Sequence, residues 1–303
     1  MSRILVSGLI NLETTLRIDG FPLPYYPVTY PFGGVHSTVS GVGLNVATAL
    51  RKLGDAVTLF SMLGHDAPGH LALDALKAAD IPTDHVLLTL DQTPQSVILY
   101  DSNGKRQIHV DLKDIQERDY PWNLAAESEL SGCDLAVLCN INFSRPLLEK
   151  ARRMGKWIAT DVHALGSLDD DYNRDFMSAA QILFMSHENL PEPPEVFARR
   201  VMERYGNAIV VIGMGADGAV LAVKGENTVR HFPAVNTRPV VNTIGAGDAL
   251  FSGVIHAYTS GRDPVQALRQ AMVFASYKIG TTGAADGFLT AEELAAWMCK
   301  SGI

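Results

Sequence analysis

One glycine-rich stretch, residues 241 to 253, holds the residues whose types and order could do chemistry. Gly245, Ala246 and Gly247 come directly before Asp248, and apolar residues then recur at helical spacing. The first amides of a helix lack carbonyl partners and form the positive end of its dipole, so this turn could hold an anion. Asp248 would repel a resting phosphate, but it suits a base that takes a proton from an attacking hydroxyl. The structural alternative is that Asp248 has no catalytic role and lies in the first turn only because the helix dipole favours a negative charge there.

A second glycine turn opens another predicted helix much earlier in the chain. Gly41 leads into a segment with apolar residues on one face, which ends at Arg51 and Lys52 and is followed by Gly54. Asn45 lies near the first turn of this segment. Its amide could donate to and accept from substrate hydroxyls, and a purely structural Asn is the alternative.

Polar residues also follow the buried strands that the sequence predicts. Asn11 and Glu13 come after the apolar run at residues 4 to 6, and Asn142 comes after the run at residues 134 to 139. In open α/β sheets, ligands gather beyond the carboxyl ends of the strands. These side chains could therefore bind a polyol, although loop residues that cap their own backbone are the alternative.

Composition narrows the class of protein. The chain has 303 residues, of which 47% are hydrophobic, so it can build a large core as one domain or two modest ones. Its formal net charge of -8 argues against a general nucleic-acid or anionic-membrane surface. We therefore expect a small-molecule ligand and neither nucleic acid nor a membrane as partner.

Three cysteines, Cys133, Cys139 and Cys299, show neither paired nor zinc-type spacing. We expect buried free thiols. The first residues lack a signal-peptide pattern, and no apolar run reaches membrane-spanning length, which predicts a cytoplasmic location.

Apolar runs alternate between strand and helix periods along the chain, which predicts an α/β fold with a mostly parallel sheet. The Pro- and Tyr-rich residues 20 to 36 and a hairpin at residues 95 to 111 interrupt this alternation, and they could form a small lid. The aromatic residues of this excursion are expected to pack in a satellite core or against another subunit, with stacking on a ring-shaped substrate as the alternative. They are Tyr25, Tyr26, Tyr30 and Phe32.

A GxGxxG pattern runs from Gly213 to Gly218. A dinucleotide fingerprint needs a helix next, but residues 219 to 224 have strand character. We reject the Rossmann interpretation and retain a glycine loop near a nucleotide.

The two glycine turns together resemble the signatures of the ribokinase-like (PfkB) family of carbohydrate and nucleoside kinases. The second reads Asn242-Thr-Ile-Gly-Ala-Gly-Asp248, and the first reads Gly41-Val-Gly-Leu-Asn45. The resemblance covers the whole chain. It implies a single domain over residues 1–303, a three-layer sandwich with a central mostly parallel sheet, and a small β lid from approximately residues 12–39 and 94–111.

The resemblance also implies roles for individual residues. Asp248 matches the catalytic base, and the three residues before it match the anion hole. The positions that match the substrate contacts are Asn11, Glu13, Gly41, Asn45 and Asn142. Gly215, Gly218 and Ser186 match the nucleotide side of the site. The implied cofactors are ATP and Mg²⁺.

Three positions depart from the family pattern. Asn242 stands where Asp is usual, which removes a negative charge near a loop that holds K⁺ in some members and argues against K⁺ activation. Glu13 stands where Asp is usual, which argues against ribose itself as substrate. Ser186-His-Glu-Asn189 replaces an Asn-x-x-Glu motif that organises Mg²⁺ through water, so Glu188 is the candidate metal residue.

The sequence therefore predicts an ATP-dependent kinase that phosphorylates a hydroxymethyl-type hydroxyl of a small sugar. A nucleoside kinase of the same family is one alternative, and a sensor that binds a sugar or nucleotide without catalysis is another. A phosphorylated sugar is disfavoured because the lid offers few cations beyond Lys105 and Arg106. The resemblance also implies a homodimer formed through the lid.

Overall fold

The computed structural model describes residues 1–102 and 104–302. Its main body is built on a nine-stranded sheet that is parallel except at one edge, where β11 pairs antiparallel with β12 and β12 with β13. Across the sheet the strands are β13 (Arg230–Phe232), β12 (Ala219–Val223), β11 (Ile209–Gly213), β10 (Ile182–Ser186), β9 (Trp157–Ala164), β8 (Leu135–Leu138), β1 (Arg3–Ser7), β4 (Ala56–Gly64) and β5 (Val86–Leu90).

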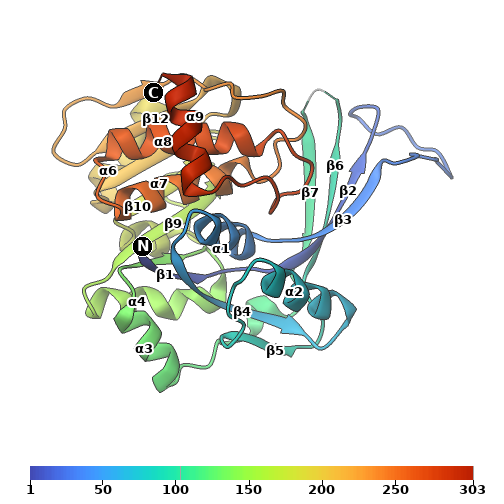
Figure 1. Ribbon diagram of the computed structural model, residues 1–303, viewed down its shortest axis with the longest axis horizontal. Coiled ribbons are helices and arrows are strands. Elements are labelled where there is room, and N and C mark those ends of the chain that lie inside the picture. The colour runs from blue at the N-terminus through green and yellow to red at the C-terminus, as the bar shows by residue number, and fades with distance from the viewer. Residues whose placement is uncertain (103, 303) are drawn as a thin grey trace.

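Helices cover both faces of this sheet, so the body has three layers (Figure 1). One face carries α1 (Val42–Lys52), α2 (Ala67–Ala78), α7 (Ala246–Thr259) and α8 (Pro264–Lys278), with α9 (Ala291–Ser301) outside α8. The other face carries α3 (Leu124–Gly132), α4 (Arg145–Arg153), α5 (Arg174–Ala179) and α6 (Pro194–Tyr205). Short 3-10 turns lie at Ile115–Glu117, Asn142–Ser144 and Gly215–Asp217.

The strand sequences explain why both faces are covered. Successive side chains of a strand point to opposite faces, and here both sets are apolar. In β1, Ile4 and Val6 pack on the α1 side while Leu5 packs on the α3 side. Each fully buried side chain of this kind contributes about 1.5–3 kcal/mol, so neither face could be left in water.

A second sheet of four strands stands beside the body at the right of Figure 1, in the order β3-β2-β6-β7. Its strands are β2 (Asn11–Arg17), β3 (Val35–Ser40), β6 (Gln95–Tyr100) and β7 (Arg106–Asp111). We call it the lid sheet. The β6 and β7 strands form the antiparallel hairpin that the sequence predicts. The turn residue Asn103 lies outside the described residues.

Strand pairing assigns the two faces of the lid sheet. Glu13 pairs with Ser96 and is buried toward the body, whereas the next pair, Thr14 with Val97, points the other way. Val35 pairs with Leu16 on this outer face. Val35 is 54% exposed and Val97 is 44% exposed, so the outer face of the lid sheet presents apolar surface.

Two expectations from the sequence need correction. The aromatic residues between β2 and β3 do not form a satellite core: Tyr25 is 90% exposed and Phe32 is 94% exposed, on a loop that extends past the lid sheet (Figure 1). Cys299 is exposed, whereas the other two thiols are buried.

The strand after the GxGxxG pattern is confirmed, because β12 follows the 3-10 turn directly. Within residues 1–102 and 104–302, we find no helix with the length and apolar character that crossing a bilayer requires.

Candidate active site

The two glycine turns lie side by side although they are far apart in the sequence. Helices α1 and α7 pack against each other, and both begin at this point. Asn45 Nδ2 in the first turn of α1 donates to Asp248 Oδ2 in the first turn of α7, at 2.7 Å. This bond links the amide and the carboxylate that the sequence singles out.

A tight turn creates the start of α7. Gly245 adopts φ 75°, in the left-handed region where a side chain is unfavourable, and a Cβ there would lie 2.7 Å from the Ala284 carbonyl oxygen. The Ala246 amide donates to the Thr243 oxygen at 3.2 Å. In the described part of the chain, the amides of Gly245 and Gly247 have no backbone acceptor. These two amides remain to bind an anion.

A close approach of backbone to backbone fixes the start of α1. Gly41 has φ 105°, and a Cβ on it would lie 2.5 Å from the Leu9 oxygen. The Gly43 amide donates to that same oxygen at 3.0 Å, and a Cβ on Gly43 would lie 2.5 Å from the Gly8 carbonyl carbon. The helix is thereby pressed against the end of β1, which places Asn45 beside Asp248.

Strand β2 brings two further predicted residues to the same region. Glu13 is buried, hydrogen-bonds Ser40 and lies within the electrostatic reach of Asp248; burial is the main reason that its pKa is raised. Asn11 Nδ2 donates to Ser96 Oγ at 2.8 Å. Among the described residues, its Oδ1 is buried without a hydrogen-bond partner. An unpaired buried acceptor is costly, and a substrate hydroxyl could satisfy it.

Opposing effects act on the charge of Asp248. Burial raises the pKa of its carboxyl, whereas the Asn45 hydrogen bond and the positive charges of His163, Lys278 and Arg106 lower it. The raised pKa makes the carboxylate a better proton acceptor than an exposed Asp. The cationic neighbours favour its charged form.

Lys278 is a member of this site that the sequence analysis missed. It ends α8, its side chain is 0% exposed, and its Nζ donates to the Ile244 oxygen in the anion-binding turn. Burial lowers its pKa from 10.5 to about 8, opposed by the charges of Asp248 and Glu13. A signal was present: Lys278 continues the buried face that Ala271 and other residues of α8 define at helical spacing.

Arg106 reaches the site from the lid sheet. Its Nη1 donates to Thr243 Oγ1 at 3.4 Å, and its Nη2 lies 3.8 Å from Glu188 Oε1. Glu188 follows β10, and its amide donates to Ser186 Oγ at 3.2 Å. The described residues contain no group of three His, Cys, Asp or Glu side chains arranged to hold a metal. Mg²⁺ in phosphate sites often takes only one or two carboxylates, and the half-exposed Glu188 fits that pattern.

The glycine loop predicted to lie by the nucleotide joins β11 to β12. Gly215 has φ 58° and Gly218 has φ 97°. A Cβ on Gly218 would lie 1.9 Å from the Phe232 oxygen, so only glycine allows this turn. The loop follows the carboxyl end of β11, next to the end of β10 where Ser186 pairs with Gly213.

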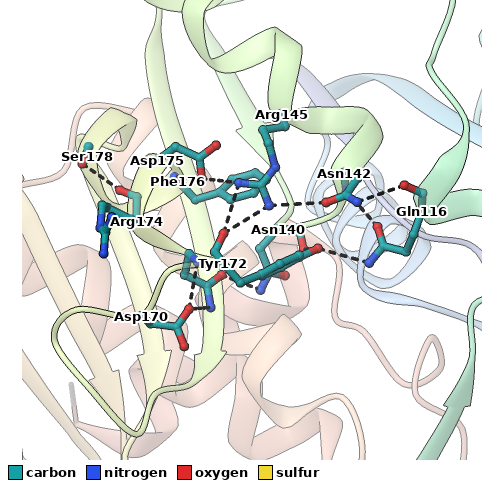
Figure 2. Close-up of polar contacts among 11 residues, drawn as sticks. Gln116, Asn140, Asn142, Arg145, Asp170, Tyr172, Arg174, Asp175, Phe176 and Ser178 are labelled. Carbon is teal, nitrogen blue, oxygen red and sulfur yellow. Dashed lines mark hydrogen bonds and ion pairs between the residues drawn. The ribbon is translucent and has the colours of Figure 1, made fainter.

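Asn142 belongs to a different network, shown in Figure 2. Its Nδ2 donates to the Gln116 carbonyl oxygen at 2.9 Å, and its Oδ1 accepts from Arg145 at 3.4 Å. The Arg145 guanidinium also lies over the Tyr172 and Phe176 rings. Both the Nδ2 and the Oδ1 of Asn142 are therefore already engaged, whereas the Oδ1 of Asn11 has no partner among the described residues.

Comparison with known proteins agrees with this geometry. Residues 1–291 match the model of the pfkB family carbohydrate kinases. The chain is 26% identical over 276 residues to acarbose 7(IV)-phosphotransferase of Actinoplanes sp., which covers 90% of this chain and 91% of that protein. It is 29% identical over 257 residues to 1-phosphofructokinase of Haloferax volcanii, which covers 81% of each chain.

Solved structures give the same result. A microbiome-derived acarbose kinase superposes with a TM-score of 0.86 at 25% identity, covering 98% of this chain and 99% of the other. The ribokinase of Thermotoga maritima superposes with a TM-score of 0.79 at 22% identity, covering 99% and 100%. The fold is thus ribokinase-like, and the chain belongs to the pfkB family of carbohydrate kinases.

Proposed function

We propose that this protein transfers the γ-phosphoryl group of ATP to a hydroxymethyl-type hydroxyl of a small sugar, with Asp248 as the general base. The observation that carries the proposal is the Asn45–Asp248 hydrogen bond of 2.7 Å at the start of α7. It holds a carboxylate of raised pKa beside the unpaired amides of Gly245 and Gly247. A base and an anion hole in contact are the parts that phosphoryl transfer to an alcohol requires.

Each group has one task in the proposed reaction. Asp248 accepts the hydroxyl proton as the substrate oxygen attacks the phosphoryl group. The amides of Gly245 and Gly247 at the start of α7 stabilise the negative charge on that group, and the amide of Ala246 joins them only if it leaves the Thr243 oxygen. The residues that orient the acceptor are Asn11, Glu13, Gly41 and Asn45. Asn142 can contact the acceptor only if its side chain gives up the hydrogen bond to Gln116.

The nucleotide would lie beyond β10 and β11, beside Ser186, Gly215 and Gly218. Mg²⁺ bound to ATP would neutralise phosphate charge, and Glu188 would hold it through water. Arg106 contacts Thr243 and pairs with Glu188, so the lid sheet reaches the site where the phosphoryl group would be transferred. Lid closure would exclude water that otherwise hydrolyses ATP.

ADP release measured over a panel of acceptors tests the proposal. The panel follows the names of the relatives: ribose, acarbose, fructose 1-phosphate, inosine and guanosine. The proposal predicts turnover of a sugar with a free hydroxymethyl group, and it fails if every acceptor binds without ADP release. Preferred turnover of inosine or guanosine would instead assign the nucleoside kinase activity.

Two further properties belong to the proposal. We expect a homodimer through the outer face of the lid sheet, supported by the exposed Val35 and Val97. A cytoplasmic location follows from the sequence expectations alone and stays a prediction.

A further inference from the structure

The buried ammonium of Lys278 needs an explanation. Its side chain is 0% exposed, its Nζ donates to the Ile244 oxygen, and it lies 3.1 Å from where a Cβ on Gly245 would be. The group therefore lies directly behind the turn whose amides face the proposed phosphoryl site. Burying an ammonium costs several kcal/mol before any pairing, and an apolar side chain would avoid that cost.

Three carboxylates from different parts of the chain lie within electrostatic reach of Lys278. They are Asp248 in α7, Glu13 in β2 and Asp286 in the segment after α8. Two of the three belong to the candidate active site. The ammonium thus balances carboxylates that would otherwise repel each other and the incoming phosphates.

Two oxygens of this turn are already occupied by N–H donors. Asn242 carries no charge; its Oδ1 accepts from the Ile244 amide at 2.8 Å, and its Nδ2 donates to the Thr282 oxygen at 3.2 Å. The Ile244 oxygen already accepts from Lys278. Each of these two oxygens thus already has an N–H donor, and an ammonium already provides the positive charge beside the turn.

We propose that Lys278 is the fixed cation of the anion-binding turn: its ammonium holds the Ile244 carbonyl and offsets Asp248 and Glu13, so that the kinase needs no monovalent cation. The inference rests on the proposed function for its effect on turnover. Lys278 is a positioning residue, because it acts through the turn rather than on the substrate.

The first experiment compares KCl with tetramethylammonium chloride at equal ionic strength. The wild-type rate is expected to be the same in both salts. Lys278→Met keeps the apolar stem of the side chain and is expected to lower kcat about 10²-fold, with little change in the KM for ATP. Removal of one preorganised group that stabilises a developing anion has an effect of this size. Lys77→Met, at an exposed ion pair on α2, is the matched control and should keep the wild-type kcat.

The second experiment uses Lys278→Ala, which leaves a space beside the Ile244 oxygen. K⁺ or ethylammonium should restore part of its kcat, whereas tetramethylammonium, which has no N–H group and is too large, should not. If Lys278 served packing alone, no small cation should selectively restore the kcat of Lys278→Ala.

A third measurement needs no substrate and therefore holds even if no acceptor is found. Thermal unfolding of the wild type should be the same in KCl and in tetramethylammonium chloride, whereas the Tm of Lys278→Ala should be higher in KCl. Three results overturn the inference: K⁺ activation or K⁺ stabilisation of the wild type, a normal kcat for Lys278→Met, or no response of Lys278→Ala to any small cation. Failure of the acceptor panel alone would count against the proposed function and not against the cation.

Discussion

At the scale of single residues, the site depends on a carboxylate whose charge is balanced between burial and its neighbours. Burial raises the pKa of Asp248, and one hydrogen bond from Asn45 opposes that effect. The motif predicts both residues but not their contact, which needs α1 and α7 to be packed. Lys278 was missed for the same reason: its burial depends on packing against Ile244, 34 residues away.

Replacement of Asp248 by Asn tests its role as a base. We expect kcat to fall about 10²- to 10⁴-fold, because general-base catalysis contributes on this scale, while substrate affinity is largely retained. Steady-state kinetics of ADP release measures both. Asp74→Asn, on the exposed face of α2, is the control, and a near-normal kcat for Asp248→Asn would remove Asp248 from the mechanism.

Removal of Asn45 tests the balance of charge. Asp248 must lose its proton to act, so kcat/KM should rise with pH through the raised pKa of this carboxyl. The Asn45 hydrogen bond lowers that pKa, so Asn45→Ala should move the acidic limb about 1 pH unit higher, as expected for a hydrogen bond of about 1.5 kcal/mol to a charged group. The other charged groups that act on Asp248 stay in place: His163, Lys278, Arg106, Glu13 and Asp161.

The control for the pH profile is Asn11→Ala, because Asn11 contacts Ser96 rather than Asp248. It should lower kcat/KM without moving the acidic limb. If Asn45→Ala leaves the limb where it is, the hydrogen bond does not set the charge of the base.

At the scale of elements, the sequence predicted strands and helices well because apolar periods report burial directly. It was wrong about a satellite core in the loop between β2 and β3, since aromatic residues pack only where a surface is available; the alternative contact with another subunit stays a prediction.

Two glycines at equivalent helix positions differ in whether a side chain would fit there. Gly43 and Gly247 are each the second residue of their helix. Ala would improve helix propensity by up to about 1 kcal/mol at either site. A Cβ on Gly43 would lie 2.5 Å from the backbone of Gly8, whereas a Cβ on Gly247 meets nothing within 4 Å.

We therefore expect Gly43→Ala to lower the free energy of unfolding by about 1–3 kcal/mol, the usual cost of overpacking, because two backbones would have to separate. Gly247→Ala should be neutral or slightly stabilising. Urea denaturation of both variants checks this prediction. Equal stability of the two would mean that α1 can move away from β1 freely.

At the scale of the whole molecule, we expect a second copy of the chain to bind the outer face of the lid sheet, where Val35 and Val97 are exposed. Sedimentation velocity should show a dimer, and Val97→Asp should shift it to monomer, because a charge buried in an apolar interface is unpaired. Val196→Asp is the matched control: Val196 on α6 is 48% exposed, against 44% for Val97. A dimer that survives Val97→Asp would place the interface elsewhere.

The course of strand β2 has a consequence for the order of events in the proposed reaction. It leaves the main body after β1 and carries Asn11 and Glu13 into the lid sheet, while Asn45 and Asp248 stay on the body. An acceptor that touches all four would bridge the two sheets, and its own binding would assemble the site. Under the proposed function, the kinetics should then be ordered, with the sugar bound before the nucleotide becomes reactive. Hydrolysis of ATP in the absence of a sugar should be slow.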